Sequence, residues 1–193
     1  MNNNTSHSES RKSGRHTTSH DYLAIARSAD LVIIRVTGLG NMRLAPTLAD
    51  FAKEQFKIGF RRFVFDLNRC QGLDSTFMGV MVEICATAQS LDRGGVSVIN
   101  SSPEVLHVLN MLGVDKFVKV CGACDLMQLE TAMLPEKDIS PDERHHMILR
   151  AHENLVEIDK RNEARFGSFL KTLSKELSQV FTAEGAEKNG TEI

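Results

Sequence analysis

The feature that most constrains the fold is a regular alternation between short apolar runs and longer segments of helical spacing, from residue 21 to about 120. Runs rich in branched apolar residues, such as 31–37 and 62–67, are typical of strands, and the second is apolar enough to be covered on both faces. Between them, Leu44, Leu48 and Phe51 recur at the spacing of one helix face. The pattern predicts strands at 22–27, 31–37, 62–67, 96–99 and 116–120, helices at 44–58, 75–91 and 101–113, and a loop at 68–74. This order is typical of an α/β domain with a mixed, largely parallel β-sheet and packed helices.

Composition divides the chain into four segments. Residues 1–20 are rich in Ser, Thr, Asn and His and are too polar to form a core, so we expect a disordered polar tail. We expect the α/β domain at 21–122 and a helical extension at 123–182. A second disordered tail is expected at 183–193.

The helical extension carries an apolar stripe. Its members step alternately by four and three residues, as in a heptad seam: Phe166, Leu170, Leu173, Leu177 and Val180. The stripe predicts one long C-terminal amphipathic helix, or a helix pair broken near Gly167. It can pack on the domain itself or on another chain, and we favour a homo-oligomer or partner docking slightly over intrachain packing.

Charge and composition exclude several classes of protein. The net charge of −2 provides no general attraction to nucleic acid, and the apolar runs are too short for membrane insertion. The N-terminus lacks the apolar segment of a secretory signal, and the four cysteines fit a reducing compartment, so we expect a cytoplasmic protein. Phosphate-binding, dinucleotide-binding, zinc-protease and serine-hydrolase motifs are missing from the sequence, so we expect no enzyme, no cofactor and no metal.

Two other groups of reactive side chains have ordinary interpretations. Cys121 and Cys124 form a single C-x-x-C after the last predicted strand, without the second pair that a zinc site needs. His145, His146 and His152 fall on the predicted long helix, and we interpret them as solvent-facing.

The most informative segment is the strand, loop and helix that meet at Asp74 and Ser75. The spacing puts a hydroxyl at a helix N-terminus beside a carboxylate, where unpaired N–H groups can hold a phosphate. Phosphorylation of Ser75 would add roughly −1.5 to −2 charges next to Asp74 and would repel a partner docked over this helix end. The same Asp-Ser pattern is also typical of an ordinary helix N-cap.

This segment resembles the signature of the STAS domain, the fold of bacterial anti-sigma factor antagonists. In that family a strand ending in D-L is followed by a loop and by D-S-S-G-L-G at a helix start. The corresponding residues here are Asp66 and Leu67, followed by the stretch Asp74-Ser75-Thr76-Phe77-Met78-Gly79. The resemblance continues through a G-G turn, a strand, and an N-x-S-P-x-V helix start at 100–105. It covers about residues 20–122, and the chain departs from it at Thr76, Phe77 and Met78.

The resemblance implies a switch that acts by binding. Ser75 corresponds to the serine that a partner kinase phosphorylates, in many members the anti-sigma factor itself, and that a serine phosphatase restores. Thr76 is a secondary candidate for phosphorylation. The unphosphorylated form would bind the anti-sigma factor through a surface formed by Asp74, Ser75, Thr76, Phe77 and Met78. We therefore expect an anti-anti-sigma factor that regulates transcription by partner switching.

Two alternatives to this switch stay open. In the first, the domain is a non-switching interaction subunit of a transporter or lipid-trafficking complex, and Ser75 is only part of a helix cap. In the second, it is a scaffold subunit of a stress-signalling complex, in which the extra helices build the oligomer. Phe77 in place of glycine favours the first of these alternatives, because a hydrophobic anchor suits a permanent interface.

Overall fold

The computed structural model describes residues 21–125 and 129–188. Its sheet is formed by β1 (Tyr22–Ser28), β2 (Leu31–Gly40), β3 (Arg62–Leu73), β4 (Gly95–Ile99), β5 (Lys119–Val120) and β6 (Ala132–Met133). The helices are α1 (Ala45–Lys57), α2 (Ser75–Gln89), α3 (Pro103–Met111), the single 3-10 turn η1 (Val114–Lys116), α4 (Pro141–Ile158) and α5 (Arg161–Lys188).

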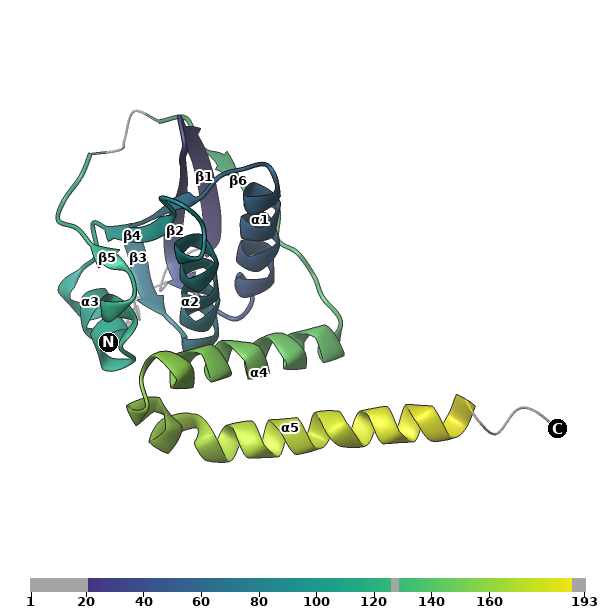
Figure 1. Cartoon of the computed structure of the whole chain (residues 1–193). Helices are drawn as coiled ribbons and strands as arrows, with labels where there is room; N and C mark the ends of the chain where they lie inside the picture. The colour runs from purple at the N-terminus through teal and green to yellow at the C-terminus, as the bar shows by residue number, and fades with distance from the viewer. Residues whose placement is uncertain (1–20, 126–128, 189–193) are drawn as a thin grey trace, which may run out of the picture.

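The described strands form one six-stranded sheet in the order β5-β4-β3-β2-β1-β6. The pairs β2–β3, β3–β4 and β4–β5 are parallel, whereas β1 runs antiparallel to both β2 and β6. Each parallel pair is joined by a helix, as β-α-β connections require. The predicted mixed, largely parallel α/β fold is therefore confirmed (Figure 1).

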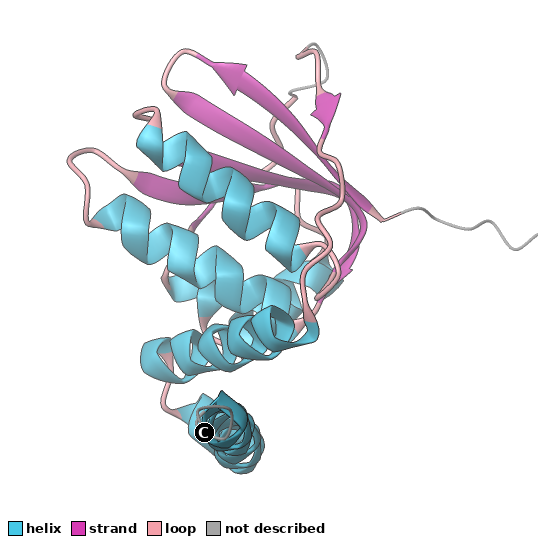
Figure 2. Ribbon diagram, turned by 90° about the vertical axis from the view of Figure 1, so that its right-hand side faces the viewer, coloured by secondary structure: helices cyan, strands magenta, loops and turns pink. Residues whose placement is uncertain are grey.

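The hydrophobic core lies between one face of the sheet and the helices. Alternate residues of the central strands point into it, such as Phe63, Phe65 and Leu67 of β3. Val105 and Leu109 of α3 belong to the same core. Figure 2 shows α1 and α2 packed side by side against the strands.

Two predicted boundaries in the domain are wrong. The segment at 68–74 was predicted as a loop, but β3 continues to Leu73 and pairs with β2 up to Gly40, through register shifts that accommodate its irregular sequence. The last predicted strand, 116–120, is reduced to β5, because η1 ends at Lys116 and the N–H groups of Phe117 and Val118 bond back to the Val114 carbonyl.

The C-terminal region forms a helical hairpin on the α/β domain. The chain breaks at Asp159 and Lys160, between α4 and α5, and Gly167 lies inside α5, so the predicted break near Gly167 is wrong. In Figure 1, α4 passes beneath the ends of α1 and α2, and α5 runs back along α4. Leu173 and Leu177 of the apolar stripe are buried within the single chain.

The expected disordered tails fall partly outside the described residues. Positions 1–20 and 189–193 lie outside them, while α5 extends through the expected start of the second tail to Lys188. Within residues 21–125 and 129–188, no helix is both apolar enough and long enough to cross a bilayer.

Candidate functional site at the start of helix α2

Asp74 fixes the start of α2. Its Oδ1 atom accepts a hydrogen bond of 2.8 Å from the Phe77 backbone N–H, which is the bond of an ordinary N-cap. Its Oδ2 atom accepts a second bond of 2.6 Å from the Met42 N–H in the β2–α1 connection. Asp74 therefore both caps the helix and fastens a neighbouring loop.

Ser75 is the first residue of α2 and contacts the C-terminal hairpin. Its Oγ atom lies 2.8 Å from Nε2 of His152 on α4. The other ring nitrogen, Nδ1, lies 2.8 Å from the carbonyl oxygen of Ile148, so Nδ1 must carry a proton to donate there. In neutral His152, Nε2 is then the acceptor and the Ser75 hydroxyl is the donor.

His152 lies in an apolar environment. It is 6 % exposed, and its ring makes edge contacts with Phe166 and Phe169 of α5, with centroid distances of 4.7 and 5.1 Å. His145 and His146 are exposed, as the sequence predicts. The solvent-facing interpretation is wrong for His152, because α4 turns this residue toward both α2 and α5.

The three residues after Ser75 are buried. Thr76, Phe77 and Met78 are 5 %, 0 % and 1 % exposed. Phe77 packs beneath Gly40, where an added Cβ would lie 3.0 Å from the Phe77 ring. In this arrangement Asp74 and Ser75 keep part of their surface accessible, and the following side chains belong to the interior.

Helices α2 and α4 touch backbone to backbone at Gly79. A Cβ atom on Gly79 would lie 2.2 Å from the Ala151 carbonyl oxygen, so only glycine permits this approach. The Asn154 side chain donates a 3.3 Å hydrogen bond to the Gly79 carbonyl. One turn farther along α2, Glu83 pairs with Arg150. The N-terminal half of α2 is thus covered by α4 from Ser75 to Glu83.

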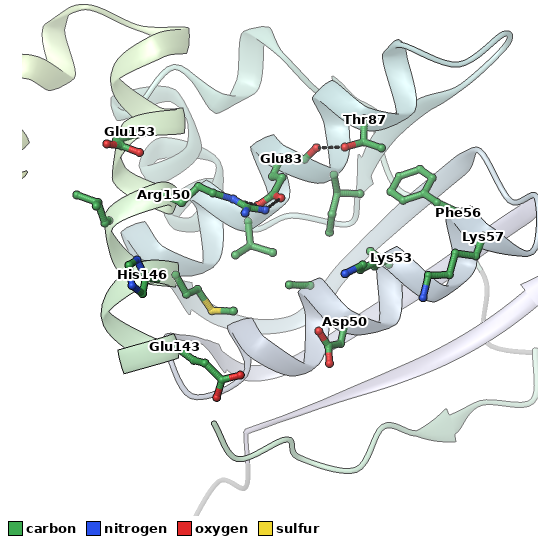
Figure 3. A pocket seen from close by; sticks show the side chains of 16 residues that line it. Asp50, Lys53, Phe56, Lys57, Glu83, Thr87, Glu143, His146, Arg150 and Glu153 are labelled. Atoms are coloured by element: carbon green, nitrogen blue, oxygen red, sulfur yellow. Dashed lines mark hydrogen bonds and ion pairs between the residues drawn. The ribbon is translucent and has the colours of Figure 1, made fainter. Parts of the chain in front are cut away.

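A groove of about 930 Å³ lies beside this contact, between α1, α2 and the N-terminal half of α4 (Figure 3). Apolar side chains such as Phe56 and Met147 line it, together with acidic and basic groups of all three helices. Figure 3 shows Glu83 and Arg150 meeting across the groove, with Asp50 and Lys53 on the α1 side.

The described residues provide no cluster of three or more His, Cys, Asp or Glu side chains suited to a metal ion.

The C-x-x-C segment is held through the backbone of Cys124. The backbone N–H of Cys124 donates to the Asn100 side chain at 2.8 Å, and the Cys124 carbonyl accepts from the same side chain at 2.9 Å. The four cysteines are free thiols, and burial raises the pKa of Cys70 and Cys85.

Comparison with known proteins identifies the family. A family model described as the STAS domain matches residues 22–125, which is more than half of the chain. The chain therefore belongs to the STAS domain family. Curated proteins provide no match.

Several solved structures are similar to part of the chain at low identity. The anti-sigma factor antagonist SpoIIAA in its unphosphorylated form is 16% identical, with 53% of this chain and 89% of that chain covered and a TM-score of 0.49. SpoIIAA of Bacillus in its phosphorylated form is 15% identical, with 53% and 92% covered and a TM-score of 0.46. An anti-sigma factor antagonist from Mycobacterium paratuberculosis is 19% identical, with 55% and 88% covered and a TM-score of 0.44.

The sequence predicts that Asp74 and Ser75 lie together at the start of a helix, but it does not predict that His152 belongs to the same site. The signal available for it was weak: a histidine among apolar residues of a predicted helix. Its partner lies 77 positions earlier in the chain, and only the packing of α4 on α2 brings the two together.

Proposed function

We propose that this protein is a phosphorylation-regulated anti-sigma factor antagonist that acts by partner switching in the cytoplasm. Unphosphorylated, it binds an anti-sigma factor that is also a serine kinase, through the surface around Ser75. Phosphorylation of Ser75 ends that binding, and a serine phosphatase restores it. The protein is a binding protein and not an enzyme.

One observation carries the proposal: a serine hydroxyl stands at the first position of α2, in the motif segment of a STAS domain, beside the carboxylate of Asp74. A phosphate there would add roughly −1.5 to −2 charges to a surface that already bears one. Ser75 is the better acceptor of the two candidates, because Thr76 is only 5 % exposed.

A second candidate function is a non-switching interaction subunit. The observations that favour it are the two backbone bonds accepted by Asp74 and the contact between Ser75 and His152. Both side chains then have a purely structural role.

A binding comparison separates the two functions. The full chain is prepared with phosphoserine at Ser75, unmodified, and with phosphoserine at Ser168, an exposed position on α5 that controls for added charge. Each form is used as bait in lysate of the native cells. The switch requires a serine-kinase partner that is retained by the unmodified and Ser168 forms and is lost by the Ser75 form. Equal retention of every partner by all three forms supports the non-switching subunit.

A further inference from the structure

We propose that the α4–α5 hairpin is an intramolecular cover of the Ser75 surface, held shut by the hydrogen bond from Ser75 to His152 and released when Ser75 is phosphorylated. This inference rests on the proposed function, because it assigns the regulation of the same surface. The cover competes with the partner for the unmodified surface, whereas the phosphate opens the cover and itself repels the partner by charge.

The cover occupies the space that a partner would need. At Gly79 the backbones of α2 and α4 are already in contact, since an added Cβ would come within 2.2 Å of the Ala151 carbonyl. Figure 2 shows α4 lying across the ends of α1 and α2, with α5 on its far side. A protein that docks along the first turns of α2 must therefore displace α4.

The bond at Ser75 is incompatible with a phosphate. The Oγ and Nε2 atoms are 2.8 Å apart, which leaves room for one hydrogen atom and not for a phosphoryl group. A phosphorylated Ser75 has no Oγ proton to donate to Nε2, so the hydrogen bond of the unmodified serine is lost. Phe166 and Phe169 line the other side of the His152 ring, and a dianion placed in this half-buried position would lose much of its hydration.

The hairpin keeps an apolar interior of its own when it leaves α2. His152 packs against Phe166 and Phe169 within the hairpin, and Leu173 and Leu177 of α5 are buried. Lifting α4 removes Leu155 from the domain's core and exposes Ala151, together with Met147 and Ile158, which pack against that core. From Glu143 to Glu153, α4 also borders the groove (Figure 3), where Met147 packs on the core and Arg150 pairs with Glu83.

Polar contacts hold the two ends of the hairpin near the domain. Before α4, the backbone N–H of Lys137 donates a 2.8 Å hydrogen bond to the Thr47 hydroxyl. After α4, the buried Asn162 side chain donates to the carbonyl of Leu112 at 2.9 Å. A released cover would stay at high local concentration and would close again once Ser75 is dephosphorylated.

The cover lowers the apparent affinity of any partner for the unphosphorylated surface, because only the open fraction of molecules can bind. Removing the Ser75–His152 hydrogen bond without adding charge should therefore strengthen partner binding. The His152→Ala variant makes this change, and His145→Ala is its matched control on an exposed position of the same helix.

Amide hydrogen exchange of the full chain tests the cover without any partner or kinase. The forms compared are unmodified protein, phosphoserine at Ser75, phosphoserine at Ser168, His152→Ala and His145→Ala. We expect exchange over 145–155 to rise by about tenfold or more in the Ser75 and His152 forms, with exchange of β3 unchanged. The two control forms should match the unmodified protein.

Two results would overturn the inference. Unchanged or slower exchange of α4 in the Ser75 form means that the hairpin tolerates the phosphate. Equal acceleration in α4 and β3 means that the hairpin is an inseparable part of the core. The binding comparison tests the proposed function separately. If phosphorylation of Ser75 ends partner binding but leaves α4 exchange unchanged, only the proposed cover is wrong. If α4 exchange rises but partner binding is the same in all forms, only the proposed switch is wrong.

Discussion

Gly79 and Ala151 mark the line along which α2 and α4 touch, with 2.2 Å between the Ala151 carbonyl oxygen and the place where a Cβ of residue 79 would stand. A domain helix and a helix of the C-terminal extension are thus in contact through their backbones. The contact lies one turn beyond Ser75, whose Oγ atom also contacts α4 at His152.

The first prediction concerns this close approach. Replacing Gly79 with Ala should favour helix α2 by itself, since glycine in a helix interior is less stable than alanine by about 0.5–1 kcal/mol. We expect the opposite sign in the full chain, a net loss of about 1–3 kcal/mol or a detached α4, because the new methyl overlaps the Ala151 carbonyl. Urea unfolding and limited proteolysis after α4 provide the measurement. Gly95→Ala is the control, since an added Cβ there meets nothing within 4 Å; a stabilised Gly79→Ala protein with protected α4 would contradict the packing.

A second prediction tests Asp74 as a structural cap. Asp74→Ala removes both acceptors of the Phe77 and Met42 N–H groups and should lower the free energy of unfolding by about 1–2 kcal/mol. Asp74→Asn keeps one acceptor oxygen and should lose less. Chemical unfolding monitored by circular dichroism measures both. Asp92→Ala changes an exposed carboxylate of a turn and should have little effect; equal stability of the Asp74→Ala and wild-type proteins would refute the cap.

The third prediction concerns the anchor at the turn of the hairpin. Asn162 is fully buried and donates to the carbonyls of Leu112 and Leu155 at 2.9 and 2.7 Å. Asn162→Ala leaves the Leu112 carbonyl without this donor, while the Leu155 carbonyl keeps the Asp159 backbone N–H, and we expect a loss of about 1–3 kcal/mol by urea unfolding. Glu163→Ala, at an exposed neighbouring position, is the matched control. A loss no larger than that of the control would show that the turn is held by other contacts.

The fourth prediction is a pH dependence at Asp159. The Arg161 side chain is the largest cause of a pKa of Asp159 well below the ordinary value of an aspartate, and Lys116 adds to the effect. A carboxylate with a depressed pKa in the folded state stabilises that state above its unfolded pKa, and the contribution disappears as the pH falls. The wild-type protein should exceed Asp159→Asn in stability at neutral pH, and the difference should shrink below about pH 4.

Urea midpoints of both proteins, taken across this range with Asp92→Asn as the control, measure the effect. A constant difference between wild-type and Asp159→Asn at every pH would contradict the assigned ion pair.

The central sheet could be predicted from the sequence because its signal is local. The short, nearly all-apolar run at 62–67 identifies β3, and the Asp-Ser pattern at Asp74 identifies the start of α2. The continuation of β3 to Leu73 was missed because polar and glycine residues there have low strand propensity, and pairing with β2 outweighs it.

The C-terminal region shows where local reasoning ends. The break between α4 and α5 falls at Asp159 and Lys160, which carry no glycine or proline signal, while Gly167 is accommodated inside a helix. The burial of His152 depends on Ser75, far away in the sequence, and on the phenylalanines of α5. Only tertiary contacts decide these features, so a single sequence does not reveal them.

The most direct test of the central claim is intact-mass and peptide mass spectrometry of the protein purified from its native cells during growth, starvation and stress. Wild-type protein is compared with Ser75→Ala and with the control Ser168→Ala. We expect a single phosphate that maps to Ser75, is absent from Ser75→Ala and is retained in Ser168→Ala. Wild-type protein that carries no phosphate under any of these conditions, or carries it at another residue, would contradict the switch at Ser75.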